Sequence, residues 1–309
     1  NISSKTLKPG KPNAALEFLR EIGQGTSATV FLCELSGENY AVKVANLISR
    51  DDRFDVMLRF RTEAALLEQV NHPSVVSIKA LEVREGRPVS IMEHIPFPTL
   101  DTTLAEGAIG LEETLSLATE LCEALAEIHR HGIVHRDLQP GNIFWDRETK
   151  KIKLIDFGLA VAAGHDQSSQ VVGTIFYLSP EQTGELRRVL DGRSDLYSLG
   201  VIMFHCLTGF PPYAAAGSSE VIDMHLRAEI PRIRDFDETL PERLEALICK
   251  LMAKDPDDRY ASALDLLDDL RGIQSGPSER LEAPRRRRDK FVGRKLELTS
   301  LKKLWRDTA

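Results

Sequence analysis

The sequence predicts an α+β protein with two unequal parts, a small part built on antiparallel strands and a larger, mainly helical part. In the first 95 residues, short apolar runs are bounded by Gly, Asn and Pro, as antiparallel strands should be. After Pro98, apolar residues recur at helical spacing. A sheet-rich part followed by a helical part indicates two lobes with a cleft between them.

The elements of each part follow from these patterns. Strands of the first part are expected at residues 18–22, 29–34, 40–44, 75–82 and 89–95. One main helix interrupts them, since apolar residues from Val56 to Val70 recur at helical spacing, with Glu63 on the same face. In the second part, helices are expected around residues 115–128, 196–207, 244–252 and 261–270.

The chain divides into four segments. Residues 1–13 are polar and are expected to form a leader, residues 14–95 the first lobe and residues 96–274 the second. Residues 275–309 contain two prolines and a run of four arginines, which is typical of a linker before a further domain. Because the chain starts at Asn1 rather than Met, an excised or processed piece of a longer protein is expected.

Composition narrows the class of protein. With 42% apolar and 28% charged residues, the chain has ordinary globular composition, and its net charge of −7 argues against nucleic acid as a partner. The four cysteines form no CxxC pair, which favours reduced thiols in a cytoplasmic protein over a zinc or disulfide framework. No apolar run is long enough to span a bilayer and no signal peptide opens the chain, so no membrane partner is expected.

A glycine loop, IGQGTSATV, occupies residues 22–30 between two expected strands. Glycines let backbone amides approach phosphate oxygens closely, although a tight hairpin needs glycines too. A strand follows the loop rather than a helix, which argues against a dinucleotide-binding fingerprint. Ala28 occupies the third glycine position.

Lys43 lies inside an apolar strand, in the run AVK at residues 41–43. A lysine buried without a counter-charge is costly, so an acidic partner is expected. Glu63, on the inner face of the predicted helix, is the natural partner. The alternative is a surface ion pair on an edge strand.

The most specific pattern is HRDLQPGN at residues 135–142, followed by DFG at residues 156–158. At this spacing it resembles the catalytic core of eukaryote-like (Hanks-type) serine/threonine protein kinases. The resemblance implies that Asp137 accepts the proton of the attacking hydroxyl and that Lys43, paired to Glu63, contacts the phosphates of ATP. It also implies that Asn142 and Asp156 hold Mg²⁺, with Mn²⁺ as an alternative; their oxygens are the hard ligands that Mg²⁺ prefers.

The resemblance extends from about Phe18 to Gly272 and implies further roles. GTIFYLSPE at residues 173–181 is similar to the substrate-binding end of an activation segment, in which Thr174 contacts the catalytic loop. Asp195 would steady that loop, and Arg259 would pair with Glu181. The sequences of residues 177–182 and 195–200 resemble those of bacterial members of this kinase family. The implied ATP site consists of Ile22, Gly23, Gly25, Val30, Ala41, Lys43, Met92 as gatekeeper, Glu93 and Ile95 as hinge, and Phe144.

One core position departs from the family pattern. Gln139 replaces the lysine two residues after the catalytic aspartate, which removes a positive charge near the γ-phosphate, and Gly141 supplies no arginine instead. Three alternatives follow: an active kinase of protein serines and threonines, a pseudokinase that binds nucleotide with weak transfer, or a small-molecule kinase of the aminoglycoside or choline type. The segment at residues 173–181 argues against the last.

Two further patterns leave alternatives open. His129, His131 and His135 are either a metal cluster or packing residues around the catalytic loop. Ser168 and Ser169 are either phosphorylation sites that would pair with Arg136 or solvated loop residues.

The tail sequence FVGRKLEL at residues 291–298 resembles the opening of a STAND/AAA-type ATPase domain. No GxxxxGK[ST] phosphate loop occurs in the chain, so such a domain, linked in cis, would lie beyond Ala309. The alternative is an amphipathic closing helix.

Overall fold

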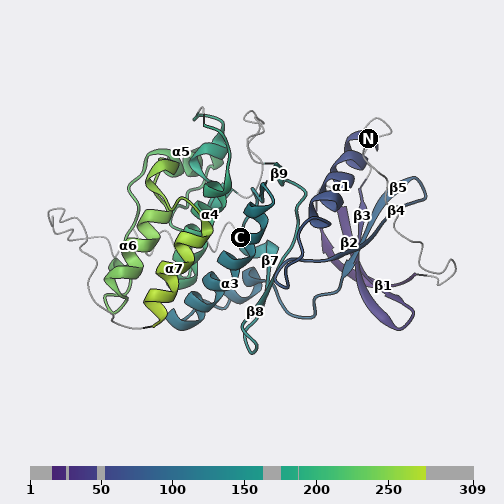
Figure 1. Ribbon diagram of the computed structural model, residues 1–309, viewed down its shortest axis with the longest axis horizontal. Coiled ribbons are helices and arrows are strands. Elements are labelled where there is room, and N and C mark those ends of the chain that lie inside the picture. Colours follow the sequence, from purple (N-terminus) through teal and green to yellow (C-terminus); the bar gives the residue numbers. More distant parts are fainter. Residues whose placement is uncertain (1–15, 26–27, 47–52, 163–174, 187, 276–309) are drawn as a thin grey trace. The chain divides into compact units, whose positions relative to one another are not determined.

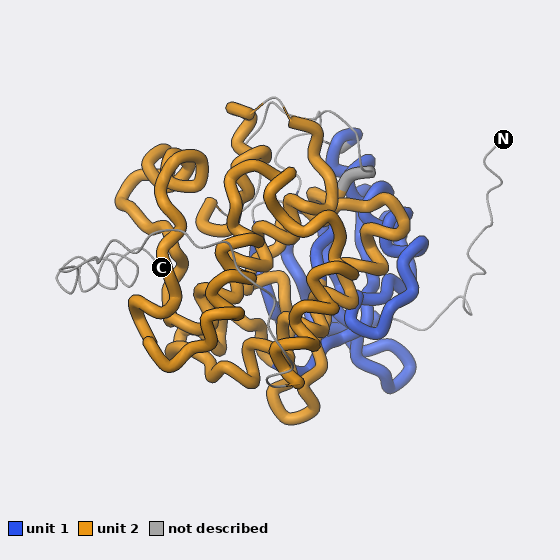
Figure 2. Tube along the Cα trace, turned by 60° about the vertical axis from the view of Figure 1, so that its left-hand side comes forward, with its two compact units in different colours: residues 1–97, 155–158 blue, residues 98–154, 159–309 orange. Residues whose placement is uncertain are grey.

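The computed structural model describes residues 16–25, 28–46, 53–162, 175–186 and 188–275. The chain forms two compact units, coloured separately in Figure 2. Residues 1–97 with 155–158 make up the first, and residues 98–154 with 159–309 the second. We call them the sheet unit and the helical unit.

An antiparallel sheet of order β1-β2-β3-β5-β4 forms the sheet unit (Figure 1). Ser36 and Gly37 join β2 to β3, and Glu85 and Gly86 join β4 to β5, all four with positive φ. Two-residue turns of this kind match the twist of the strands they join. The strands are β1 (Glu17–Gln24), β2 (Ala28–Leu35), β3 (Glu38–Ala45), β4 (Ile78–Arg84) and β5 (Arg87–Glu93).

The one main helix of this unit, α1 (Arg53–Leu67), is anchored by an apolar contact. Phe60 of α1 is buried together with Ala28 of β2 and Ala45 of β3. Residues three apart lie on the same helix face, so Glu63 faces the same way as Phe60. This packing sets the position from which Glu63 meets the sheet.

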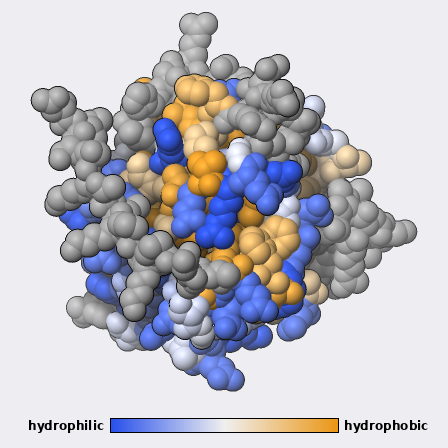
Figure 3. Space-filling view, turned by 90° about the vertical axis from the view of Figure 1, so that its right-hand side faces the viewer, coloured by the Kyte–Doolittle hydropathy of each residue, from blue (hydrophilic) through white to orange (hydrophobic). Residues whose placement is uncertain are grey.

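Part of the sheet unit's apolar surface stays exposed. Figure 3 shows hydrophobic and hydrophilic residues interspersed on one face of the molecule. In β1, Phe18, Leu19 and Ile22 are 49%, 46% and 37% exposed, and in α1 Phe54 and Leu58 are also exposed.

Helices dominate the helical unit, and α4 lies at its centre (Figure 1). From Ser194 to Cys206 every residue of α4 is buried, as expected for a core helix surrounded on all sides. At Gly200 a Cβ would approach the Cβ of Leu251 to 2.7 Å, so only glycine lets α6 pack this closely. The helices are α2 (Leu100–Leu104), α3 (Leu111–Arg130), α4 (Gly192–Thr208), α5 (Ser218–Arg227), α6 (Glu242–Leu251) and α7 (Ala263–Gln274).

Short elements carry the loops between these helices. Antiparallel pairs form between β6 (Ile133–Val134) and β9 (Val161–Ala162), and between β7 (Ile143–Asp146) and β8 (Lys151–Leu154). Five single turns of 3-10 helix complete the described part: η1 (Pro140–Asn142), η2 (Ile175–Tyr177), η3 (Pro180–Thr183), η4 (Ile233–Asp235) and η5 (Pro256–Asp258).

The predicted α+β class, with an antiparallel sheet, one main helix beside it and a mainly helical second part, is confirmed. Several boundaries differ: β4 begins at Ile78 rather than at residue 75, because Val75 donates its N–H to His72 in a turn. Within the described residues, no helix combines the length and the apolar character that crossing a bilayer would require.

Candidate active site

Lys43 is the centre of a charged cluster in the sheet unit. Its Nζ lies 3.0 Å from both carboxylate oxygens of Glu63 and 3.0 Å from Oδ1 of Asp156. The side chains of Lys43 and Glu63 are 13% and 5% exposed, whereas that of Asp156 is 41% exposed. Burial alone would lower the pKa of Lys43, but the two carboxylates more than offset this, and its pKa lies above the usual value.

Backbone geometry sets the orientation of Asp156. Its φ is +64°, a left-handed conformation that few residues other than glycine adopt. The Gly158 N–H donates to Asp156 Oδ1 at 3.2 Å, and a Cβ at Gly158 would lie only 3.0 Å from that oxygen. Phe157 is buried and anchors the turn. The sequence DFG is thus matched to a turn that directs the carboxylate at Lys43.

Strand register aligns the residues expected to bind ATP on the sheet. Gly23 pairs with Val30, and Val30 pairs with Lys43, across three neighbouring strands. Directly paired residues share a face, as do residues two apart in one strand. Ala41 therefore lies on the Lys43 face, and so does its partner Met92.

The remaining expected ATP-site residues lie around this face or in the other unit. Ile22 precedes Gly23, and the Gly25 N–H donates to the Ala28 carbonyl at 2.9 Å in the glycine loop. Glu93 ends β5 and donates its N–H to Ser77 at 3.1 Å, while Ile95 follows the strand. Phe144 lies in β7 of the helical unit, paired with Lys153.

Asp137 is held by neutral amides. Gln139 donates from Nε2 to Oδ1 and Oδ2 of Asp137, at 3.0 Å each. Asn142, in η1, donates from Nδ2 to Oδ2 and to the backbone carbonyl of Asp137, at 2.9 Å each. Since these contacts use Nδ2 of Asn142, the amide oxygen is the atom available to accept or to ligate.

A buried aspartate organises the loop that carries Asp137. The carboxylate of Asp195, in α4, accepts from the N–H groups of His135 and Arg136 at 2.9 Å each, and contacts His129 Nε2 at 2.8 Å. Burial would raise the pKa of Asp195, but these hydrogen bonds and His129 hold it below the usual value. Arg136 adopts φ +68°, so two fixed peptide groups turn the chain immediately before Asp137.

Histidines near this loop have other partners than a metal. His129 contacts Asp195, His131 contacts Glu127 at 3.0 Å, and His135 Nδ1 accepts from the Asp137 N–H at 3.3 Å. The described residues contain no group of three His, Cys, Asp or Glu side chains suited to hold a metal ion. In contrast, the Asn142 amide oxygen and the Asp156 carboxylate supply oxygen donors of the kind that a hard divalent cation takes.

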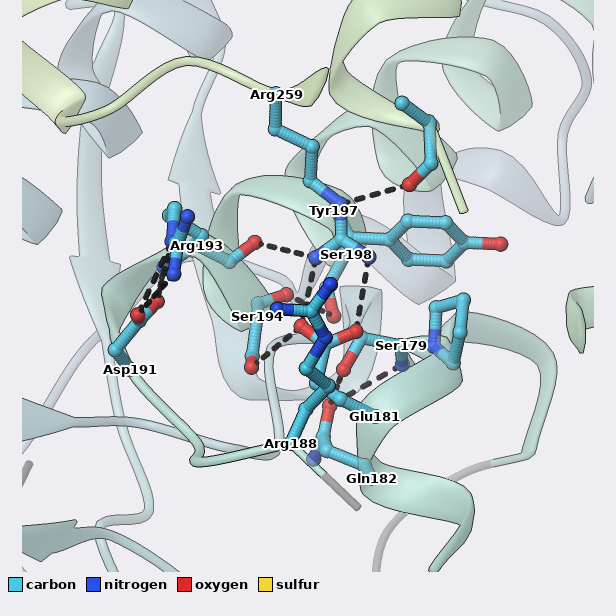
Figure 4. A network of polar contacts seen from close by, with 12 residues as sticks. Ser179, Glu181, Gln182, Arg188, Asp191, Arg193, Ser194, Tyr197, Ser198 and Arg259 are labelled. Carbon is cyan, nitrogen blue, oxygen red and sulfur yellow. Dashed lines mark hydrogen bonds and ion pairs between the residues drawn. The ribbon is translucent and has the colours of Figure 1, made fainter. Parts of the chain in front are cut away.

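A buried ion pair anchors the segment after residue 175. Arg259 donates to both carboxylate oxygens of Glu181 at 2.7 and 2.8 Å, and these side chains are 0% and 1% exposed. Figure 4 shows Ser194, which donates to Glu181 at 2.7 Å, within the same network. These contacts therefore fix the position of η3 relative to α4. Thr174, Ser168 and Ser169 lie outside the described residues.

One buried residue next to the site was missed in the sequence. Gln182 of η3 accepts from the N–H and the hydroxyl of Ser179 at 3.2 and 2.8 Å, and donates to the Arg136 carbonyl at 2.6 Å. The spacing Ser-x-x-Gln is that of a capping box, which was a readable signal for the first contact. No local pattern predicts the second contact, which joins residues 46 apart.

Residues 16–269 match the family model of the protein kinase domain, and the chain belongs to that family. It is 34% identical over 262 residues to serine/threonine-protein kinase PrkC of Bacillus subtilis, which covers 82% of this chain and 40% of the relative. It is 36% identical over 249 residues to serine/threonine-protein kinase PknB of Mycolicibacterium smegmatis, covering 76% and 39%.

PknB of Mycobacterium tuberculosis is 35% identical over 257 residues, covering 79% of this chain and 40% of the relative. The chain thus spans about 40% of the length of these curated relatives. Membership of the family carries with it the use of ATP and a divalent metal. Relatives named as serine/threonine-protein kinases favour an active kinase over a pseudokinase.

Proposed function

We propose that this domain transfers the γ-phosphate of Mg-ATP to serine or threonine hydroxyls of proteins. The observation that carries the proposal is the contact of Lys43 with Glu63 and Asp156 at 3.0 Å. Protein kinases need the lysine–glutamate pair and the DFG aspartate in place at the same time. The glycine loop and the gatekeeper position, on the same face of the sheet, are where we place ATP.

Each residue of the site has a proposed role in the transfer. Lys43 would bind the α- and β-phosphates of ATP, and Asn142 and Asp156 would supply oxygen ligands for Mg²⁺, or for Mn²⁺ in its place. A divalent cation bound there would neutralise charge on the phosphates. The oxygen of the substrate hydroxyl forms a bond to the γ-phosphorus, and ADP leaves as the bond between the β- and γ-phosphates breaks. Asp137 accepts the proton that this hydroxyl loses.

Further residues complete the proposed site. Gln139 orients the Asp137 carboxylate through two hydrogen bonds. For Thr174, which lies outside the described residues, the proposed role is the contact with the catalytic loop that the family resemblance implies. Adenine binds to backbone groups of Glu93 and Ile95. The apolar side chains proposed to contact the sugar and base of ATP are Ile22, Val30, Ala41, Met92 and Phe144.

The test is transfer of radiolabelled phosphate from Mg-ATP to the chain itself and to casein. The native chain should transfer label, and Asp137→Asn, Lys43→Ala and Asp156→Ala should reduce transfer to background while thermal unfolding stays cooperative. Normal transfer by any of the three folded variants contradicts the assignment. Binding of ATP without transfer by the native chain would indicate a pseudokinase, and transfer only to small molecules a different kinase class.

We further propose domain limits and a setting for this activity. Residues 14–95 and 96–274 form the two kinase lobes, and residues 275–309 link them to a STAND/AAA-type ATPase region in cis. The supporting observation is the FVGRKLEL run at residues 291–298. A phosphate-binding loop encoded beyond Ala309 is the expected finding; another type of domain there would refute the linkage. The four described cysteines are free thiols, which supports a cytoplasmic location.

A further inference from the structure

Gln182 connects the segment around Ser179 to the backbone of the catalytic loop. Its Nε2 donates to the Arg136 carbonyl at 2.6 Å, and its Oε1 accepts from Ser179, so both ends of the amide are engaged. The side chain is buried, and Figure 4 shows it beside Ser179 in η3. An amide used at both ends can hold only one orientation, which makes Gln182 a rigid link between the two segments.

The atom that Gln182 holds is directly next to Asp137. The Arg136 carbonyl and the Asp137 N–H belong to one peptide group, and the N–H end of that group contacts His135 Nδ1 at 3.3 Å. The preceding peptide group is held by Asp195 through the Arg136 N–H at 2.9 Å. Arg136 has a φ of +68°, so the two peptide groups meet at a strained residue that needs holding on both sides.

We propose that Gln182 is a positioning residue for the proton acceptor: it fixes the Arg136–Asp137 peptide and thereby aims the Asp137 carboxylate. This inference rests on the proposed role of Asp137. The element η3 lies in the segment that resembles the substrate-binding part of kinases. Through Gln182, the orientation of the Asp137 carboxylate therefore depends on whether that segment is ordered. Asp195 holds one side of the strained residue and Gln182 the other.

The chain offers a substitution that separates the two ends of the link. Gln182→Glu keeps acceptor oxygens for Ser179, since Ser-x-x-Glu is also a capping box, but an ionised carboxylate cannot donate to the Arg136 carbonyl. Gln182→Met removes both contacts at similar size. The matched control is Thr183→Val, which loses a buried hydrogen bond to Pro180 in the same turn but none to the catalytic loop.

Steady-state transfer to casein is measured for the full chain and for these variants. Gln182→Glu should lower kcat about ten- to hundred-fold, as expected for a misaimed catalytic group, with KM for ATP unchanged. Thr183→Val should keep kcat.

An unchanged kcat in Gln182→Glu, or an equal loss of kcat in Thr183→Val, would overturn the inference. Hydrogen exchange of the backbone of residues 135–139 tests it without any transfer. Exchange should accelerate in Gln182→Glu and not in Thr183→Val, and equal rates would overturn the link. Absence of Asp137-dependent transfer in the native chain refutes the proposed function instead, and is seen before any Gln182 variant is compared.

Discussion

Lys43 in the sheet unit and Asp137 in the helical unit are both held by two neighbouring side chains, but the neighbours differ in charge. The cation Lys43 meets two carboxylates, whereas the anion Asp137 meets the neutral amides of Gln139 and Asn142. Ion pairs fix Lys43 and oppose its deprotonation. Amides fix the direction of the Asp137 carboxylate and leave its charge uncompensated by these contacts.

Two buried histidines of the helical unit, His205 and His225, also contact neutral groups. The Tyr177 hydroxyl contacts His205 Nδ1 at 2.8 Å, and the Tyr197 hydroxyl contacts His225 Nδ1 at 2.9 Å. Burial lowers the pKa of His205 to about 4. Burial, with Lys254 nearby, lowers that of His225 to about 3. Both histidines are therefore neutral in the folded protein at pH 7.

The largest expected effect is loss of stability in mild acid. An unfolded histidine has a pKa of about 6.5, so below that value the unfolded state binds protons that the folded state refuses. Stability is present above the unfolded pKa and is lost as pH falls from 6.5 towards the folded values. Between pH 7 and 5, each histidine should contribute about 2 kcal/mol of destabilisation.

Chemical unfolding of the native chain at pH 7, 6 and 5 measures this loss. His205→Asn and His225→Asn keep an acceptor near the Nδ1 position and remove the titrating group, so each should flatten the slope of stability against pH. Tyr213, whose ring lies 5.0 Å from that of His225, stays in place as a neutral neighbour. A slope identical in the native chain and in both variants would show that these histidines do not titrate as buried neutral groups.

The next effect concerns the neutral neighbour of Asp137. Gln139→Lys should raise kcat, because a cation near the γ-phosphate would compensate charge in the transition state. Restoring about 1.4 kcal/mol corresponds to roughly a ten-fold gain. Saturating Mg-ATP kinetics measure it, with Gln139→Met as the control that removes both hydrogen bonds to Asp137. An unchanged or lower kcat in Gln139→Lys would show that the site is adapted to glutamine.

How far the sequence predicts this site depends on the kind of contact. The need of a buried lysine for a counter-charge pointed to Glu63, and the resemblance paired Arg259 with Glu181; the structure contains both ion pairs. Their roles in transfer remain predictions. The Asp156 contact with Lys43 was not anticipated, because it depends on the positive φ of Asp156 rather than on residue type.

The predicted fold shows a similar limit. Apolar periodicity identified the sheet, α1 and the long helices, because their core faces follow regular spacing. It missed α2 and the short strands β6, β7 and β9, which have too few residues to display a period. It also missed α5, in which only Val221 and His225 are buried, so that the helix has no continuous apolar core face. The hydrogen bond from Gln182 to Arg136 could not be predicted from the sequence for another reason. It joins a side chain to a backbone carbonyl, and the direction of that carbonyl is set by backbone geometry.

The smallest expected effect concerns Arg136, a buried cation of the helical unit. Its Nε atom has no hydrogen-bond partner among the described residues, and burial lowers its pKa, which Asp195 only partly offsets. A phosphate on Ser168 or Ser169 would add about −1.5 to −2 charges and could order the activation segment by pairing with this guanidinium. Phosphorylation at these serines should therefore raise activity about five-fold.

Mass spectrometry after incubation with Mg-ATP should find phosphate on Ser168 or Ser169, and the Ser168→Ala/Ser169→Ala double variant should lose the five-fold gain. Phosphatase treatment of the native chain is the matched control, because it removes the charge without changing a residue. Unmodified serines together with full activity of the double variant would remove this switch, and Arg136 would then act only through the backbone contacts that hold Asp137.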